Sequence, residues 1–172
     1  MISQQNRKPT KPSRVLLIGA RGFIGAAILR RLEAEDVPTL ALGSGDIDLS
    51  GAVAADRLAE MLRPDDSVVM LAALTPDKGR DIATLMKNLS MMQTVCAALE
   101  KSGCAHLVYF SSDAVYEARA SRVTEDTPAS PEDLYGTMHR TREIMARSLA
   151  DVPVLVLRPT VVYGLDDTHN SY

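Results

Sequence analysis

Short apolar runs alternate along the chain with longer segments in which apolar residues recur every three or four positions. The short runs predict buried strands, because they are compact and do not alternate with polar residues. These strands are expected at 14–18, 38–42, 67–71, 106–110 and 154–157, with a stub of a further strand at 47–49. The helical spacing predicts helices over 22–35, 53–62, 81–100 and 130–149.

Two helix ends carry clear boundary residues. The third helix is expected to stop just after Lys101, because Gly103 lies immediately beyond it. The fourth is expected to open at 130–133, where a serine can cap, a proline suits the first position and two carboxylates suit the positive end of the helix dipole.

Apolar strands separated by helices predict a parallel sheet that is buried on both faces. Right-handed crossovers then give a doubly wound α/β fold of the Rossmann type, with ligands at the carboxyl ends of the strands. Residues 1–13 are polar and interrupted by prolines, so they are expected to form a flexible tail ahead of one domain over 14–172.

Charge and composition narrow the function classes. The chain has 19 Lys and Arg against 22 Asp and Glu, a net charge of −3, so no global field draws nucleic acid or an anionic membrane. Its first residues lack the apolar core of a secretory signal, and no apolar run is long enough to span a bilayer. Cys96 and Cys104 are then expected to be buried thiols rather than a disulfide or metal ligands. A cytoplasmic protein without nucleic acid, membrane or metal is predicted.

A glycine-rich segment joins the first predicted strand to the first helix. It reads Gly19-Ala20-Arg21-Gly22-Phe23-Ile24-Gly25. Glycines let the backbone come close to a pyrophosphate, and the helix N-terminus offers unpaired N–H groups and a partial positive charge. The strand–turn–helix context therefore favours a dinucleotide cofactor bound by this segment.

The end of the second predicted strand bears on which dinucleotide binds. Dinucleotide folds often place an acid there for the ribose 2′-hydroxyl, but this strand runs into Gly43-Ser44-Gly45, with no carboxylate before Asp46. Arg21 can pair with a 2′-phosphate through its planar guanidinium. NADP is therefore slightly favoured over NAD, and Ser44 or Asp46 would contact the ribose if NAD binds.

Two further clusters carry groups suited to proton transfer. Ser112 and Asp113 follow the strand at 106–110, and a serine at this end of a strand can hydrogen-bond a substrate carbonyl or hydroxyl. Tyr135 and His139 lie four residues apart, on one face of the fourth helix. A tyrosine whose pKa is lowered by a neighbouring cation can act as a general acid and base.

Taken in order, these motifs resemble the extended short-chain dehydrogenase/reductases, the NAD-dependent epimerase/dehydratase group. The resemblance covers about 15–170 and rests on residues 19–25, 71–73, 88, 111–116, 135–139 and 158–164. It implies that Ser112 is the catalytic hydroxyl and Tyr135 the acid/base, with Asp113 where dehydratase-type members carry an acid. It also implies cofactor contacts at Asp48 and Leu49 for the adenine, at Leu71, Ala72 and Ala73 for the ribose and at Pro159 for the nicotinamide, with Asn88 as support near the site.

The main departure from the family pattern lies at His139, where the Y-x-x-x-K motif of the family has its lysine. That lysine binds the nicotinamide ribose and lowers the pKa of the tyrosine. An unperturbed histidine is mostly neutral at pH 7, so it can hydrogen-bond the ribose but stabilises a phenolate less. Either the enzyme is slow and pH-sensitive, or its chemistry is arranged differently, or the site only binds. If the missing cation limits the rate, His139→Lys is expected to raise activity near neutral pH.

The second departure is length. Family members continue well beyond the motif at 158–164, so the C-terminal substrate part is expected to be absent or truncated. The leading hypothesis is an NAD(P)-dependent epimerase or oxidoreductase acting on a sugar or nucleotide-sugar hydroxyl or ketone. Ala114 stands where dehydratases carry a second carboxylate, which favours oxidoreduction or epimerisation over dehydration. The alternative is a non-catalytic dinucleotide-binding module. The stretch 86–92 is either a homodimer face or part of the core.

Overall fold

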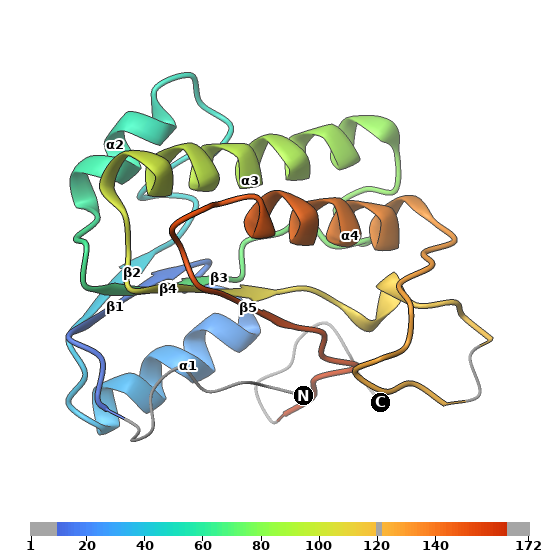
Figure 1. Ribbon diagram of the computed structural model, residues 1–172, viewed down its shortest axis with the longest axis horizontal. Coiled ribbons are helices and arrows are strands. Elements are labelled where there is room, and N and C mark those ends of the chain that lie inside the picture. The colour runs from blue at the N-terminus through green and yellow to red at the C-terminus, as the bar shows by residue number, and fades with distance from the viewer. Residues whose placement is uncertain (1–9, 120–121, 165–172) are drawn as a thin grey trace.

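The computed structural model describes residues 10–119 and 122–164 as an α/β fold in three layers (Figure 1). A five-stranded sheet in the order β2-β1-β3-β4-β5 forms the middle layer, and every neighbouring pair of strands is parallel. The strands are β1 (Arg14–Ile18), β2 (Thr39–Leu42), β3 (Asp66–Met70), β4 (His106–Phe110) and β5 (Val154–Leu157). The doubly wound Rossmann-like fold predicted from the sequence is confirmed.

Four α-helices cover the sheet within the described residues. They are α1 (Phe23–Ala34), α2 (Ala54–Met61), α3 (Ile82–Ser102) and α4 (Leu134–Arg147), and a short 3₁₀ helix, η1 (Asp113–Val115), follows β4. Helix α1 lies on one face of the sheet, and α2, α3 and α4 lie on the other (Figure 1). No helix in the described ranges is long and apolar enough to cross a membrane.

The hydrophobic core is divided by the sheet. Leu16 and Leu17 are both fully buried, and they belong to different clusters because neighbouring side chains of a strand point to opposite faces. The larger cluster includes Met92 of α3, and the smaller one packs against Leu32 of α1. Burial on both faces is therefore confirmed for β1 and β3, whereas β4 is half-buried on one face. At the edge strand β5 it is wrong, since Leu155 remains 38% exposed.

The predicted strand stub at 47–49 is not present. Ile47 and Leu49 lie in an irregular loop, yet both side chains are buried in the larger core cluster. The apolar residues there predicted burial correctly. They did not predict the backbone conformation, because two buried residues on a loop and a very short strand have the same sequence pattern.

The predicted start of α4 is also wrong by about one turn. The helix begins at Leu134, and Asp133 caps it by accepting a hydrogen bond from the Gly136 N–H at 2.7 Å. Ser130 instead donates its backbone N–H to the Val115 carbonyl at 2.8 Å, which holds this part of the chain outside the helix. The end of α3 matches the prediction, because Gly103 follows its last turn with φ of 69°.

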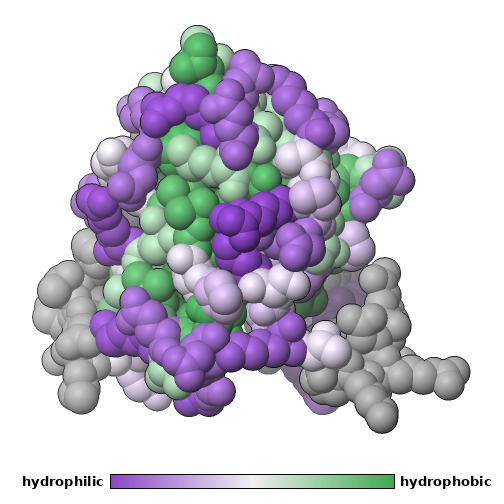
Figure 2. All heavy atoms as spheres, turned by 90° about the vertical axis from the view of Figure 1, so that its left-hand side faces the viewer, coloured by the Kyte–Doolittle hydropathy of each residue, from purple (hydrophilic) through white to green (hydrophobic). Residues whose placement is uncertain are grey.

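Figure 2 shows the end of the molecule where the strands begin, a surface that mixes hydrophilic and hydrophobic residues. Here Arg14 and the buried Asp66 form an ion pair at 2.6 Å that joins β1 to β3. Burial acts to raise the pKa of Asp66, but the Arg14 guanidinium and the Arg63 N–H outweigh it, so the pKa is lowered. The pair is structural, because the candidate chemistry lies at the opposite ends of the strands.

Candidate active site

The glycine-rich segment forms a tight turn between β1 and α1. Gly19 has φ of 94°, and a Cβ there would lie 2.8 Å from the Ala72 backbone nitrogen. A Cβ on Gly25 would lie 2.2 Å from the Gly19 carbonyl oxygen, so the helix can pack against the turn only with glycine at this position. Gly22 is the N-cap of α1, with no side chain capping the helix. The first N–H groups of α1 therefore meet no capping side chain, the arrangement that suits a pyrophosphate.

The turn after β2 lies directly beside the glycine-rich segment. Nη2 of Arg21 is 3.1 Å from both carboxylate oxygens of Asp46, and the Arg21 side chain crosses so close that a Cβ on Gly43 would lie 2.8 Å from its Cδ. Ser44 is exposed in this turn. Nη2 of Arg57 is 3.5 Å from the Asp46 carbonyl oxygen, which adds a guanidinium that the sequence analysis did not single out. Two cations and one acid thus surround this turn.

Asp48 and Leu49, expected at the adenine, have different surroundings. Asp48 is exposed and accepts a hydrogen bond from the Ser50 N–H at 2.9 Å, which lowers the pKa of its carboxyl. The Leu49 side chain is 5% exposed and belongs to the core. Any contact between Leu49 and a cofactor therefore comes from its backbone.

Tyr135 lies in the first turn of α4, half-buried and close to Ser112. The close packing depends on Gly136, where a Cβ would lie 2.1 Å from the Ala114 carbonyl oxygen of η1. Burial raises the pKa of Tyr135, while the Ser112 hydroxyl acts to lower it and the Asp113 carboxylate to raise it. The Ser112 hydroxyl also accepts from the Ala114 N–H at 3.1 Å, so it is held next to the phenol.

His139 is buried one turn further along α4, with 2% of its surface exposed. Its Nδ1 is 2.7 Å from the Tyr109 hydroxyl, and its ring meets the Tyr135 ring edge-on at 4.7 Å between centroids. Burial, together with the positive charge of Arg142, lowers the pKa of His139 to about 3. The imidazole is therefore neutral at physiological pH. Within the described ranges, its Nε2 is buried without a hydrogen-bond partner.

Arg142 is a residue that the sequence analysis missed. It is fully buried, donates from Nη2 to the Ala72 carbonyl at 2.9 Å and lies 5.2 Å from the centroid of the Tyr109 ring. No carboxylate in the described part of the chain forms a salt bridge with it. A signal was present in the sequence, because Arg142 follows Met138 by four residues on the face of α4 that is buried.

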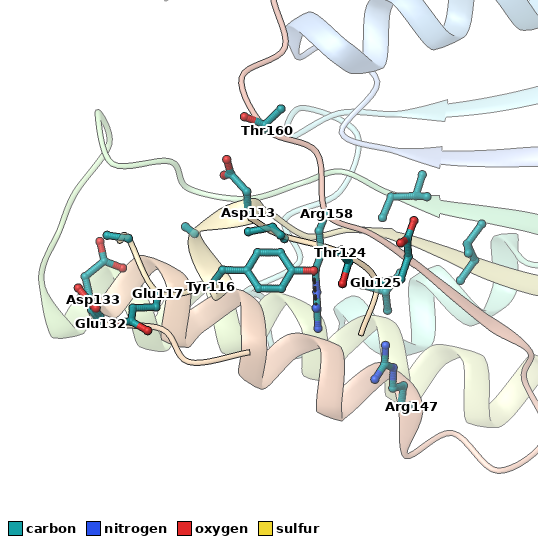
Figure 3. A pocket seen from close by; sticks show the side chains of 16 residues that line it. Asp113, Tyr116, Glu117, Thr124, Glu125, Glu132, Asp133, Arg147, Arg158 and Thr160 are labelled. Atoms are coloured by element: carbon teal, nitrogen blue, oxygen red, sulfur yellow. Dashed lines mark hydrogen bonds between the residues drawn. The ribbon is translucent and has the colours of Figure 1, made fainter. Parts of the chain in front are cut away.

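A second buried cluster surrounds Glu143. Its carboxylate accepts from Nη2 of Arg158 at 2.7 Å, from Nη1 of Arg140 at 3.0 Å and from the Ser111 hydroxyl at 2.7 Å. Arg158 also donates to the Tyr116 hydroxyl at 2.9 Å, the contact drawn in Figure 3. Burial acts to raise the pKa of Glu143, but these donors outweigh it, so the pKa is lowered. The cluster joins η1, α4 and the end of β5.

Two cavities adjoin the candidate acid/base residues. The larger, of about 1170 Å³, is bordered by Asp113, Tyr116, Arg158 and Thr160 (Figure 3). The smaller, of about 490 Å³, is lined by Tyr135 together with Leu74, Asn88 and Met138 among others. Asn88 is buried and holds the Leu74 backbone by accepting from its N–H at 2.8 Å and donating to its carbonyl at 3.0 Å.

The residues expected to bind cofactor and substrate lie mostly at the carboxyl ends of the strands. Gly19 touches the segment at 71–72, Ala72 touches Arg142, and Tyr135 lies beside Ser112. The Asp113 N–H donates to the Pro159 carbonyl at 3.1 Å, which brings the end of β5 to the same place.

Comparison with known proteins decides the family. Residues 15–171 match the NAD-dependent epimerase/dehydratase family. The chain belongs to this family. A relative in Escherichia coli is 29% identical over 170 residues, covering 92% of this chain and 51% of the relative, and is named N-acetyl-alpha-D-glucosaminyl-diphospho-ditrans,octacis-undecaprenol 4-epimerase. Another, from Xenopus tropicalis, is 26% identical over 161 residues, covering 88% of this chain and 47% of the relative, and is named methionine adenosyltransferase 2 subunit beta.

Solved structures of family-like proteins share the fold. A GDP-L-fucose synthetase from Naegleria fowleri bound to NADP matches with a TM-score of 0.79 at 22% identity, covering 98% of this chain and 56% of that one. The chain spans about half the length of the curated relatives that it matches.

Proposed function

We propose that the chain forms the cofactor-binding and proton-transfer part of an NAD(P)-dependent oxidoreductase or epimerase that acts on a sugar-type hydroxyl or ketone. One observation carries the proposal: the first turn of α4, with Tyr135, packs against η1 next to Ser112, at the carboxyl ends of the strands, where α1 also begins without a capping side chain. The family supports the reaction class, and the E. coli relative is by name a 4-epimerase of an N-acetylglucosaminyl-diphospho-undecaprenol.

The residues present fit a dinucleotide. At the N-cap Gly22 a Cβ would meet only the Gly19 carbonyl oxygen, at 3.5 Å, so this side of the turn is open, and the uncapped N–H groups of α1 suit the pyrophosphate. The backbone at 71–73 would border the ribose, with Pro159 towards the nicotinamide. His139, expected at the ribose, does not present Nε2 to a cofactor, because that atom is buried and only 2% of the residue is exposed. The bound nicotinamide supplies hydride transfer, which no side chain can perform.

Proton transfer falls to the side chains. Tyr135 gives a proton to the substrate oxygen or takes one from it, while the Ser112 hydroxyl orients that oxygen. Substrate would reach Tyr135 through the smaller cavity, since Tyr135 lines it. Asp113 is exposed and has Ala114 rather than a second carboxylate beside it, which favours oxidoreduction or epimerisation over dehydration.

The proposal also extends to the choice between NADP and NAD, which differ by a phosphate on the 2′-oxygen of the adenosine ribose. Arg21 and Arg57 present two guanidinium groups at the turn after β2, where the adenosine ribose would lie. They favour a 2′-phosphate, and hence NADP, over a free hydroxyl. Asp46 opposes this choice, because it pairs with Arg21 and would repel the phosphate.

Gly22→Asp tests the cofactor site. An aspartate at this N-cap would hydrogen-bond the free N–H groups of α1, stabilise the protein by about 0.5–1 kcal/mol and repel the pyrophosphate. We expect NADPH and NADH to bind at least about tenfold more weakly, measured by nicotinamide fluorescence and heat of binding. Val53→Asp is the matched control, because Val53 is the N-cap of α2, also without a side-chain cap. Equal binding by wild type and Gly22→Asp would place the cofactor elsewhere.

Arg21→Ala and Asp46→Asn test the preference for NADP. Arg21→Ala is expected to weaken NADPH by about tenfold and to change NADH little, because one exposed guanidinium–phosphate contact is lost. Asp46→Asn should do the opposite and tighten NADPH, since it frees Arg21 and removes a repulsive charge. A wild-type preference for NADH, weakened by Asp46→Asn, would instead assign Asp46 to the ribose hydroxyls.

A non-catalytic dinucleotide-binding module is the second candidate. It is favoured by the buried, neutral His139 and by the relative whose name is that of a methionine adenosyltransferase subunit. Cofactor binding without turnover of a keto sugar would support this candidate. Turnover that is lost in Tyr135→Phe would exclude it.

A further inference from the structure

We propose that Arg142 supplies the positive charge beside Tyr135 that position 139 lacks, an inference that rests on the proposed function. The family places a lysine one turn after the catalytic tyrosine, and this chain has the neutral His139 there. Arg142 lies on the same helix, three residues after His139, and is fully buried. It acts on the phenol through space and through its neighbours, so it is a positioning residue.

The surroundings of Arg142 leave its charge uncompensated. Nη2 donates to the Ala72 carbonyl and Nη1 approaches the Met138 sulfur at 3.8 Å, while Nε has no hydrogen-bond partner among the described residues. The adjacent acid, Glu143, is already bound by Arg158 and other donors. A buried charge that no carboxylate neutralises acts over a longer range than a paired one, because little solvent or counter-charge screens it.

A chain of contacts joins Arg142 to the candidate acid/base. Arg142 lies against the Tyr109 ring of β4, the Tyr109 hydroxyl meets Nδ1 of His139, and the His139 ring meets the edge of Tyr135. Tyr109 therefore contacts the Arg142 guanidinium through its ring and the His139 imidazole through its hydroxyl.

The titratable groups around Tyr135 support this assignment. Burial raises the pKa of Tyr135, Asp113 from η1 and Asp133 at the start of α4 add to this, and Ser112 and Arg142 act to lower it. Around Arg142 itself lie Tyr109 of β4 and Cys96 of α3. Burial is the main cause of the lowered pKa of His139, Arg142 adds to it and Glu143 opposes it, so the histidine does not supply the charge.

The presence of Arg142 changes what is expected of His139→Lys. A lysine at this position would place a second buried cation near Arg142, which forms no salt bridge with a carboxylate of the described residues. The single substitution is therefore expected to destabilise the protein rather than to raise activity, in contrast to the expectation from the sequence.

Arg142→Met and Arg142→Lys test the proposal. Methionine keeps much of the length without the charge, and lysine keeps the charge. In the cofactor-bound protein, the Tyr135 phenol is followed by NMR of ¹³C-labelled tyrosine, with Tyr135→Phe to assign its signal. We expect Arg142→Met to raise the pKa of Tyr135 by about one unit and to lower kcat near pH 7 by about tenfold, with the loss recovered at higher pH. Arg142→Lys should keep the wild-type profile.

The outcomes separate this inference from the proposed function. A Tyr135 phenol that ionises at the same pH in wild type and Arg142→Met, or in neither, overturns the role of Arg142 even if the enzyme turns over. An activity loss that is equal at every pH, or that Arg142→Lys does not rescue, also overturns it. If the cofactor does not bind, the NMR titration of the free protein still decides about Arg142, and the proposed function alone fails.

Discussion

Arg142 of α4 is fully buried and Arg158, just after β5, is partly buried, and the two arginines have opposite environments. Arg158 forms two hydrogen bonds with the Glu143 carboxylate, which raise its pKa, whereas Arg142 is deeper, forms no salt bridge within the described residues and has a lowered pKa through burial. The first is a neutralised pair that ties the end of β5 to the helix. The second keeps its charge available to Tyr109, His139 and Tyr135. The difference indicates which of the two clusters is structural and which is placed for chemistry.

Of the substitutions that test this contrast between the two arginines, Glu143→Gln should cause the largest loss of stability. It removes the negative partner of a pair whose carboxylate is completely buried and leaves Arg158 without compensation. We expect a loss of about 3 kcal/mol in the free energy of unfolding at pH 7, measured by urea denaturation. Arg142→Met is the matched control, because it removes a buried charge that forms no salt bridge within the described residues. Its expected change is below about 1 kcal/mol in either direction.

The pH dependence of this loss follows from the pKa of Glu143. Because the folded protein lowers that pKa, the pair contributes stability above the unfolded value of 4.5 and loses it as the pH falls through the lower folded value. The difference between wild type and Glu143→Gln should therefore shrink in acid. A difference that stays constant between pH 7 and pH 3, or an equally large loss in Arg142→Met, would contradict the contrast between the two arginines.

Much of the fold and part of the site could be predicted from the sequence. Apolar runs gave the five strands, and the spacing of Gly19, Gly22 and Gly25 gave the turn whose close contacts with Ala72 require glycine. These features are local, because a strand, a turn and a helix start are each specified by neighbouring residues. The error at 130–133 has the same origin: Asp133 and Ser130 are both good caps, and only the distant Val115 carbonyl decides between them.

The electrostatics of the site could not be predicted in this way. Arg21 was expected to be free for a phosphate, but Asp46 pairs with it across a turn formed by residues 25 positions away. His139 was expected to be mostly neutral, and the reason that it is wholly neutral is a buried arginine and the loss of water. The burial of His139 and the unpaired charge of Arg142 depend on how α4 packs against β4 and the end of β3. The local sequence pattern does not predict this packing.

The smallest expected change in stability comes from the titration of His139. Its pKa is about 3 in the folded protein against an ordinary 6.5, so between these values the unfolded chain binds a proton that the folded chain does not. Stability should therefore be complete above pH 6.5 and fall as the pH decreases, by about 2 kcal/mol at pH 5. His139→Gln can still accept from the Tyr109 hydroxyl but does not titrate, so its unfolding free energy should depend less on pH over this range. Equal slopes for the two proteins, measured by urea denaturation from pH 7.5 to pH 4.5, would mean that His139 takes up a proton while folded, which is incompatible with an uncompensated Arg142 beside it.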